Sequence, residues 1–225
     1  MKKQSGFLHR LIALALALCM LAALTAEIFA ADIVASGYCG GEGDGKNLSW
    51  TLDSEGTLTI SGTGWMINYT YSNAPWYTLR SKCKKLVLGS GITSIGDYAF
   101  YDCSGLTGSL TLPNSVTSIG VSAFNGCSGF TCSLTIPNSV KSIGGGAFSG
   151  CSGFAGSLII PDSVTNIGWN AFYNCSGFNG GLTIPNSVTS IGYSAFEGCY
   201  GFTGNLKIPD SVTSIGGRAF EGCSG

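Results

Sequence analysis

Cysteine is the most frequent reactive side chain of this 225-residue chain, with ten copies. No two of them have the C-x-x-C spacing of a zinc or redox site. In an oxidising compartment, ten cysteines can build a disulfide framework. Six of them, however, recur every 24 residues, so their side chains should point in parallel. Cysteine is also among the most buried residue types when it is free. We therefore expect a column of buried thiols, and leave a Cys39–Cys83 bridge outside it as an open alternative. The six are Cys103, Cys127, Cys151, Cys175, Cys199 and Cys223.

Groups for acid–base catalysis are scarce. His9 is the only histidine, and it precedes the part of the chain that we expect to fold. That excludes Ser-His-Asp and Cys-His catalysis and histidine-based metal sites. Asp162 and Asp210 share one repeat position two repeats apart, which places them about 10 Å from each other, near the upper limit for an inverting glycosidase pair. Asn186 lies between them, and turn formation accounts better for Asn and Asp after Pro. We expect no catalytic, cofactor-binding or metal-binding residues, and no enzyme.

A glycine-rich stretch, Gly40 to Asn47, resembles a phosphate-binding loop only superficially. It reads GGEGDGKN, one residue short, with Asn47 where Ser or Thr should stand. A phosphate-binding loop also needs a strand before it and a helix after it. A hairpin pattern follows here instead, so we exclude a nucleotide site.

A 24-residue unit, clearest at residues 134–157, organises the rest of the chain. Each copy contains an Ile-Gly step, then an Ala-Phe step, then a Cys three residues after the Phe. A fixed period of this length indicates a solenoid. The Ile-Gly steps begin at Ile95, Ile119, Ile143, Ile167, Ile191 and Ile215, and the Phe residues are Phe100, Phe124, Phe148, Phe172, Phe196 and Phe220.

Within one unit the apolar residues predict two short extended segments and a corner. Residues 133–136 alternate polar and apolar, which is typical of a half-buried strand that Pro137 ends. Residues 140–143 predict a second extended segment. Ala147, Phe148 and Cys151 suit a tight helical or 3₁₀ corner. One unit buries too little to fold alone, so neighbouring units must stack and align their apolar side chains in columns.

The unit resembles the BspA-like leucine-rich repeats, which read as an apolar strand ending in Ile-Pro, followed by V-x-x-I-G-x-x-A-F-x-x-C. The resemblance covers residues 86–225, although the segment between Cys and strand is one residue longer here. It implies a curved β-solenoid, secreted or on a cell surface, often linked to adhesion and host-protein binding. For many family members no activity is known.

The N-terminal residues predict a leader and a cap. Residues 1–31 have a basic start, an apolar core from Leu11 to Leu24 and small residues at Ala30 and Ala31, as a secretory signal peptide does. Residues 32–85 lack the repeat. They contain a hairpin pattern at 48–61, with Trp50, Trp65, Trp76 and Tyr77 as a small core. We expect them to cover the open end of the solenoid; a similar Trp-containing segment is common in the BspA-like family.

Charge narrows the class of partner. Beyond residue 31 the chain has 8 Lys and Arg against 11 Asp and Glu, a net charge of −3. Nucleic acid is therefore an unsuitable partner, and no segment after the leader is apolar enough to insert in a membrane.

Recognition should depend on the positions that vary between units, chiefly the two after Ile-Gly. Trp169 and Tyr193 share one such position on adjacent units, and we expect their rings about 5 Å apart on the outside. Tyr173 should project from the next corner. Exposed aromatic side chains suit sugar faces or a protein contact, although they also suit simple shielding of the backbone.

The sequence thus predicts a mostly β, leucine-rich-repeat solenoid of about six 24-residue rungs with an N-terminal β-hairpin cap. The expected parts are a signal peptide (1–31), a cap (32–85) and repeats (86–225), the last rung incomplete. The expected function is a secreted or cell-surface scaffold that binds protein or glycan through Trp169, Tyr173 and Tyr193. The alternative is a targeting or spacer module of a larger surface protein whose activity lies in another domain.

Overall fold

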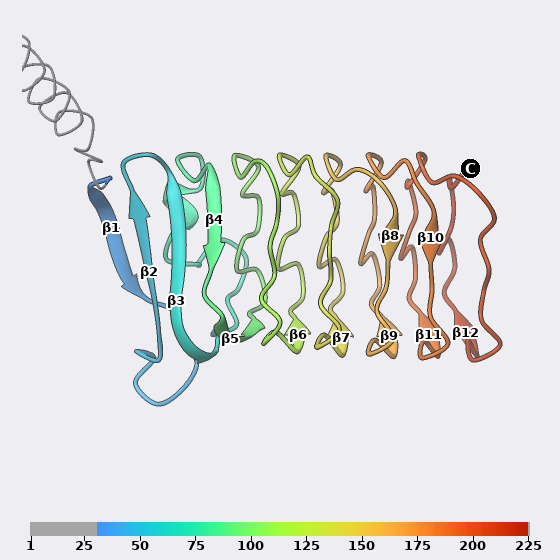
Figure 1. The fold of residues 1–225 in the computed structure, drawn as a ribbon, viewed down its shortest axis with the longest axis horizontal. Coiled ribbons are helices and arrows are strands. Elements are labelled where there is room, and N and C mark those ends of the chain that lie inside the picture. Colours follow the sequence, from blue (N-terminus) through green and yellow to red (C-terminus); the bar gives the residue numbers. More distant parts are fainter. Residues whose placement is uncertain (1–30, 225) are drawn as a thin grey trace, which may run out of the picture. The chain divides into compact units, whose positions relative to one another are not determined.

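A computed structural model describes residues 31–224. The chain divides into two units, Met1–Asp32 and Ile33–Gly225, and only residues 31 and 32 of the first are described. The expected signal peptide therefore lies outside the described residues. In the second unit the chain winds into a mostly β solenoid (Figure 1), as predicted. Its elements are β1 (Ile33–Tyr38), β2 (Leu48–Asp53), β3 (Thr57–Trp65), η1 (Tyr77–Leu79), β4 (Lys85–Leu88), β5 (Gly91–Ile95), β6 (Ser118–Ile119), β7 (Ser142–Ile143), β8 (Leu158–Ile159), β9 (Asn166–Ile167), β10 (Leu182–Thr183), β11 (Ser190–Ile191) and β12 (Ser214–Ile215).

One continuous parallel ladder runs along the lower edge in Figure 1. It connects β5, β6, β7, β9, β11 and β12, and each strand pairs with residues 24 positions away. The glycine after each isoleucine allows this close approach. At Gly168 an added Cβ would lie 2.6 Å from the backbone nitrogen of Gly145 on the preceding rung. Each 24-residue turn of the solenoid, here called a rung, therefore stacks in register on the one before.

The cap forms an antiparallel sheet that continues into the solenoid. β1 pairs with β2, and β2 with β3, with Trp50 opposite Ile60 in the hairpin that the sequence predicts. β3 then pairs in parallel with both β4 and β5. Trp76 is fully buried, donates its Nε1 proton to the carbonyl of Ala99 at 2.7 Å, and stacks on Phe100. The cap thus supplies the first ring of the core.

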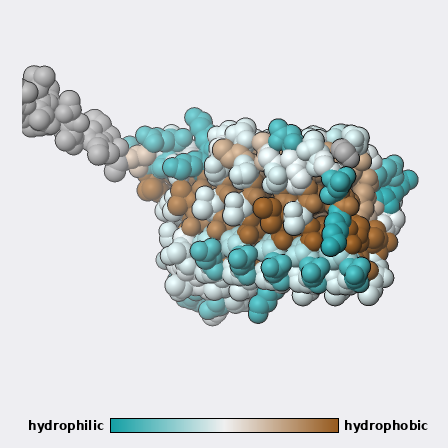
Figure 2. All heavy atoms as spheres, turned by 45° about the vertical axis from the view of Figure 1, so that its right-hand side comes forward, coloured by the Kyte–Doolittle hydropathy of each residue, from teal (hydrophilic) through white to brown (hydrophobic). Residues whose placement is uncertain are grey.

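Two stacks of aromatic rings fill the core. The rings of Phe100, Phe124, Phe148, Phe172, Phe196 and Phe220 stack with centroid distances of 5.1 to 5.5 Å. A second stack, which continues a position that begins with Leu106, contains Phe130, Phe154, Phe178 and Phe202. Because equivalent side chains sit above one another, residues of like polarity also form rows on the surface that run from rung to rung (Figure 2).

The predicted corner is not helical. Residues 144–151 form successive turns, and η1 in the cap is the one helical segment of residues 31–224. Within the corner, Cys151 N donates to Phe148 O on its own rung, whereas Phe148 N donates to Ala171 O on the next. This alternation needs a residue with a positive φ angle at a fixed position of every rung. Of the six residues at that position, five are not glycine. They are Tyr98, Ser122, Asn170, Ser194 and Arg218, with Gly146 the sixth.

The cysteine column is buried, as predicted, apart from the half-buried Cys223, and five of its six thiols donate a hydrogen bond to the preceding rung. Cys151 Sγ donates to the carbonyl of Phe124 on the preceding rung at 3.1 Å, and Cys127 and Cys175 repeat this contact at 3.0 Å. Cys199 and Cys223 do the same at 3.1 and 3.2 Å. Every cysteine of residues 31–224 is a free thiol, including Cys39 and Cys83, which are both buried. The thiols therefore link consecutive rungs through hydrogen bonds to the backbone.

Candidate functional site

A shallow trough of about 680 Å³ follows the continuous ladder across four rungs. Its floor is formed by exposed or half-buried Ser, Thr and Asn side chains within or directly before β5, β6, β7 and β9, among them Thr93, Thr117, Ser142 and Asn166. The isoleucines between them point inward and are buried. The surface along the trough therefore offers a regular array of hydroxyl and amide groups about 4.8 Å apart.

Two tryptophans line this trough, Trp65 from the end of β3 and Trp169 from the rung of β9. Their exposed fractions are 42% and 52%. Between them lies one carboxylate, that of Asp97, whose Oδ1 accepts a hydrogen bond from the Val121 amide at 2.7 Å. Asn68 in turn accepts a hydrogen bond from the Asp97 amide at 3.0 Å. These bonds fix Asp97 as part of the wall.

The Trp169 ring leans toward the cap because the preceding rung carries glycine. A Cβ on Gly145 would lie 2.2 Å from Trp169 Cε2, so the indole covers Gly145 closely. Tyr193 leans the other way, where a Cβ on Gly217 would lie 3.3 Å from its Cε2. The two rings diverge and form no aromatic pair, so the expected 5 Å separation is wrong. The physical reason is that each ring packs over a glycine at the equivalent position of a neighbouring rung. Trp169 packs over Gly145 of the preceding rung, and Tyr193 packs over Gly217 of the following rung.

The three predicted ligand-binding residues are not brought together. Trp169 lines the trough, whereas Tyr193 and Tyr173 do not. Tyr193 is 53% exposed, and Tyr173 is half-buried, with its carbonyl accepting a hydrogen bond from the Gly150 amide. The geometry thus favours Trp169 over the two tyrosines, while the binding role of all three stays a prediction.

Trp65 is the trough residue that sequence reasoning placed wrongly, in the core of the cap. The core does contain Trp50 and Trp76, but Trp65 lies outside and covers Gly41. The reason is local. Gly62 and Gly64 have positive φ angles, and the pairing of β3 with β5 shifts register between Gly64 and Trp65. A G-x-G-W sequence at the end of a strand is the signal that pointed to such a change of face.

A cluster of tyrosines forms a second surface feature that sequence reasoning missed. Tyr71, 60% exposed, packs edge-on against Tyr101 at 4.8 Å and lies 6.4 Å from Tyr77. Tyr98 joins Tyr101 at 5.8 Å, and the Arg80 guanidinium lies 4.1 Å above the Tyr77 ring. Burial raises the pKa of Tyr101 above its ordinary value, so its phenol stays neutral. The signal was two tyrosines, at 98 and 101, in one corner of one rung.

Other chemistry finds little support in the geometry. Asp162 and Asp210 are exposed and do not line the trough. In residues 31–224, no three His, Cys, Asp or Glu side chains are grouped so as to hold a metal ion. Asn47 of the glycine-rich stretch serves the backbone. Its Nδ2 donates to the Thr63 carbonyl at 3.0 Å, and its Oδ1 accepts from the Glu42 amide at 3.1 Å. No helix in the described part of the chain is both long and apolar enough to span a membrane.

Comparison with known proteins agrees with this architecture. The sequence profile described as BspA type leucine rich repeat region matches residues 76–203 and 180–225, in six copies. A search of curated proteins finds no significant match. Among solved structures, a Treponema pallidum leucine rich repeat protein is 25% identical, with a TM-score of 0.59, over 81% of this chain and 89% of its own.

Two further solved structures are similar over longer proteins. A leucine-rich repeat protein from Eubacterium ventriosum is 24% identical, with a TM-score of 0.56, over 83% of this chain and 63% of its own. A leucine rich cell surface protein from Faecalibacterium prausnitzii is 26% identical, with a TM-score of 0.58, over 81% and 52%. This chain thus spans less than two thirds of the length of both. With rungs, core columns and profile in agreement, the chain belongs to the family of BspA-type leucine-rich repeat proteins.

Proposed function

We propose that this protein is a non-enzymatic binding scaffold at the bacterial cell surface, and that the trough between Trp65 and Trp169 holds a glycan chain. The trough carries this proposal. Sugars bind to proteins through aromatic faces and through hydrogen bonds to their hydroxyl groups. Both kinds of contact occur here in one open, elongated surface.

Several features support the proposal. The location rests on the N-terminal signal pattern and on the similarity to a protein described as a leucine rich cell surface protein. Preference for a neutral or weakly charged glycan rests on Asp97, the one charged side chain among the trough residues. The tyrosine cluster suits a protein contact, because Tyr and Arg are enriched at protein hot spots.

The proposal can be tested on a glycan array. The full chain should bind one class of glycan, and Trp169→Ala or Trp65→Ala should each weaken that binding by roughly tenfold, since base stacking on aromatic rings of similar size contributes about 1–3 kcal/mol. Tyr193→Ala removes an equally exposed aromatic ring outside the trough and should leave the affinity unchanged. No glycan binding, or equal losses in all three variants, would remove the trough from consideration.

A second candidate function is a spacer or targeting module in a larger surface protein. The length of the two longer relatives favours it, because this chain matches only part of each. In that case the full chain should bind no glycan or protein ligand. Deletion of whole rungs should leave the activity of the larger protein unchanged and should shorten only the distance that the module spans.

A further inference from the structure

Positive charge is concentrated in one short segment before and within β4. Residues 32–225 contain eight Lys and Arg, and four of them are Arg80, Lys82, Lys84 and Lys85. Arg80 pairs with Asp102 at 3.3 Å. The three lysines take part in none of the ion pairs found among residues 31–224. This segment therefore presents three uncompensated ammonium groups on a chain whose net charge is negative.

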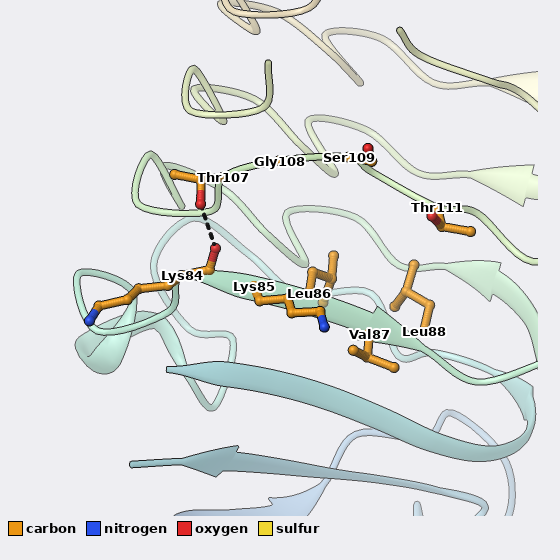
Figure 3. A pocket seen from close by; sticks show the side chains of 9 residues that line it. All are labelled: Lys84, Lys85, Leu86, Val87, Leu88, Thr107, Gly108, Ser109 and Thr111. Carbon is orange, nitrogen blue, oxygen red and sulfur yellow. Dashed lines mark hydrogen bonds between the residues drawn. The ribbon is translucent and has the colours of Figure 1, made fainter. Parts of the chain in front are cut away.

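A groove of about 490 Å³ lies directly beside two of these lysines, Lys84 and Lys85 (Figure 3). Lys84, Lys85 and the rest of β4 form one wall, and residues 107–111 of the next rung form the other. The groove includes Leu86, Val87 and Leu88 and no aromatic side chain. An elongated groove with aliphatic walls and lysines at one end suits a chain with both apolar and acidic side chains.

The edge of β4 that faces this groove lacks a partner strand. On its other side β4 pairs with β3 from Lys85 to Leu88. On the side of the next rung, β4 is joined to the following segment at the Lys84 carbonyl, which accepts hydrogen bonds from Thr107 N at 2.8 Å and from Thr107 Oγ1 at 3.2 Å (Figure 3). Beyond that point the two segments separate, and no backbone pairing joins β4 to residues 109–112.

The same face is closed by strand pairing at one junction of the solenoid. β8 and β10 pair directly, with Leu158 N donating to Gly181 O at 3.0 Å and Ile160 N to Thr183 O at 3.1 Å. An open edge recurs between residues 133–136 and 157–160, but no lysine lines the groove there, whereas Lys84 and Lys85 line the groove at β4. Unpaired strand edges are ready templates for an added strand.

We propose that the groove beside β4 binds an extended acidic peptide segment, which adds a strand to the free edge of β4. Its backbone bonds to β4, its apolar side chains contact Leu86 and Leu88, and its carboxylates lie near Lys84 and Lys85. The Asp53 carboxylate lines a neighbouring pocket and not this groove, and it accepts hydrogen bonds from the Thr57 and Glu55 amides within its own hairpin turn. This site is independent of the glycan trough.

An anionic polysaccharide would satisfy the lysines but would leave the strand edge unpaired and would place hydroxyl groups against leucine. The observations therefore favour a peptide, and the test below separates the two.

The probe is a short fluorescein-labelled peptide of alternating Glu and Val, titrated into the full chain and followed by fluorescence anisotropy. It should bind more weakly at about 0.5 M than at about 0.05 M NaCl, because salt screens exposed charges. The double variant Lys84→Gln, Lys85→Gln should weaken binding by roughly tenfold, the upper range for two exposed ion pairs. Lys141→Gln, Lys207→Gln makes the same charge change on exposed residues outside the groove and should bind as the parent does.

A second peptide with the same sequence, N-methylated at alternate residues, separates strand addition from simple charge attraction. It keeps every carboxylate but loses the amide donors of one edge, so its affinity should fall at least tenfold. Equal affinity of the methylated peptide would overturn the proposal. So would failure of the plain peptide to bind, or displacement of it by a heparin fragment that binds more tightly and depends on the same lysines.

Discussion

A thiol is the smallest apolar side chain that can also donate a hydrogen bond, and the solenoid uses both properties at one position. In each corner the phenylalanine carbonyl accepts one hydrogen bond from the cysteine amide of its own rung and a second one from the Cys Sγ of the next rung. Serine would donate more strongly but would lose apolar contact, and alanine would remove the second hydrogen bond, which is the one that joins the two rungs. The repeated cysteine therefore reflects hydrogen bonding as much as size.

Burial of these thiols predicts sensitivity to alkaline pH. Burial raises the pKa of Cys103 and Cys199 to about 12 and that of Cys127, Cys151 and Cys175 well above the usual range. In the unfolded chain a cysteine ionises near pH 8.5. Above that pH the unfolded state loses protons that the folded state keeps, so each buried thiol lowers the free energy of unfolding by about 1.4 kcal/mol per pH unit.

Urea unfolding followed by tryptophan fluorescence from pH 7 to about pH 10.5 should therefore show stability falling steeply above about pH 8.5. The variant Cys151→Ala should be less stable at pH 7 but should lose stability more slowly as the pH rises. A stability that stays flat to the highest pH would contradict the buried, protonated column.

Gly145 controls the position of the indole that lines the trough. Its φ angle is not in the left-handed region, and an added Cβ would lie 2.2 Å from Trp169 Cε2. Gly145→Ala should therefore displace the ring, weaken glycan binding about as much as Trp169→Ala, and leave the far-ultraviolet circular dichroism unchanged. Gly217→Ala is the matched control, since the Cβ there lies 3.3 Å from Tyr193. Normal glycan affinity in Gly145→Ala would show that the ring position is unimportant.

Side-chain type and spacing were enough to predict burial, but not which way an exposed ring leans. The column of Phe148 and Cys151 follows from the 24-residue period. The direction of Trp169 depends on Gly145, 24 residues earlier, and so on a pair of variable positions that periodicity leaves open. Likewise, the exposure of Trp65 depends on the conformations of Gly62 and Gly64 rather than on its own type.

At the scale of the rung, side chains add a second set of bonds between neighbours. In each Pro-Asn-Ser-Val or Pro-Asp-Ser-Val turn the serine hydroxyl donates to a carbonyl of the preceding rung, for example Ser139 to Val116 at 2.6 Å and Ser187 to Val164 at 2.7 Å. The turn itself was predictable from Asn or Asp after Pro, and Val140 N donates to Pro137 O as such a turn requires. The serine contact was not predictable, since it becomes visible only when two rungs are stacked.

The corner was predicted to be helical because the alternation of hydrogen bonds within and between rungs does not change the spacing of hydrophobic residues.

Because each rung contacts its neighbours through the same atoms, a whole rung should be removable. Deletion of residues 182–205 should leave a folded protein in which Ile167 of β9 pairs with Ile215 of β12, with an unchanged circular dichroism spectrum per residue and a lower melting temperature. Deletion of the half unit 182–193 alters the register of every later residue and should unfold the last rungs. Equal behaviour of the two deletions would contradict a core built from columns in register.

Over the whole molecule, the core is one continuous stack that begins at the cap. Trp76 contacts Trp50 edge-on at 5.7 Å and stacks on Phe100 at 5.5 Å, so it joins the antiparallel cap sheet to the first rung. The sequence predicted a hairpin cap. The parallel pairing of β3 with both β4 and β5 was not predicted, because it joins segments about 28 residues apart that lie outside the repeat pattern. The cap is therefore continuous with the solenoid through backbone and side chains alike.

Loss of Trp76 should consequently weaken one end of the protein more than the other. Trp76→Ala removes a fully buried ring and its bond to Ala99, a cost of about 3–5 kcal/mol. Native-state hydrogen exchange should show lost protection in β3, β4 and β5, with little change in β9 and β11. Uniform loss of protection along the chain would mean that the solenoid unfolds as a single cooperative unit.

The direction of the bonds between rungs also determines how the molecule responds to force. Hydrogen bonds of three kinds join one rung to the next: those of the serine hydroxyls, those of the cysteine thiols, and backbone bonds such as Gly144 N to Ile119 O and Phe124 N to Ala147 O. A pull along the solenoid axis therefore loads them one rung at a time, as in a zipper, rather than all together in shear. Each rung that opens releases 24 residues, or roughly 80 Å of extended chain. A protein built in this way lengthens in steps under tension, and the rungs not yet opened keep their shape and their surface.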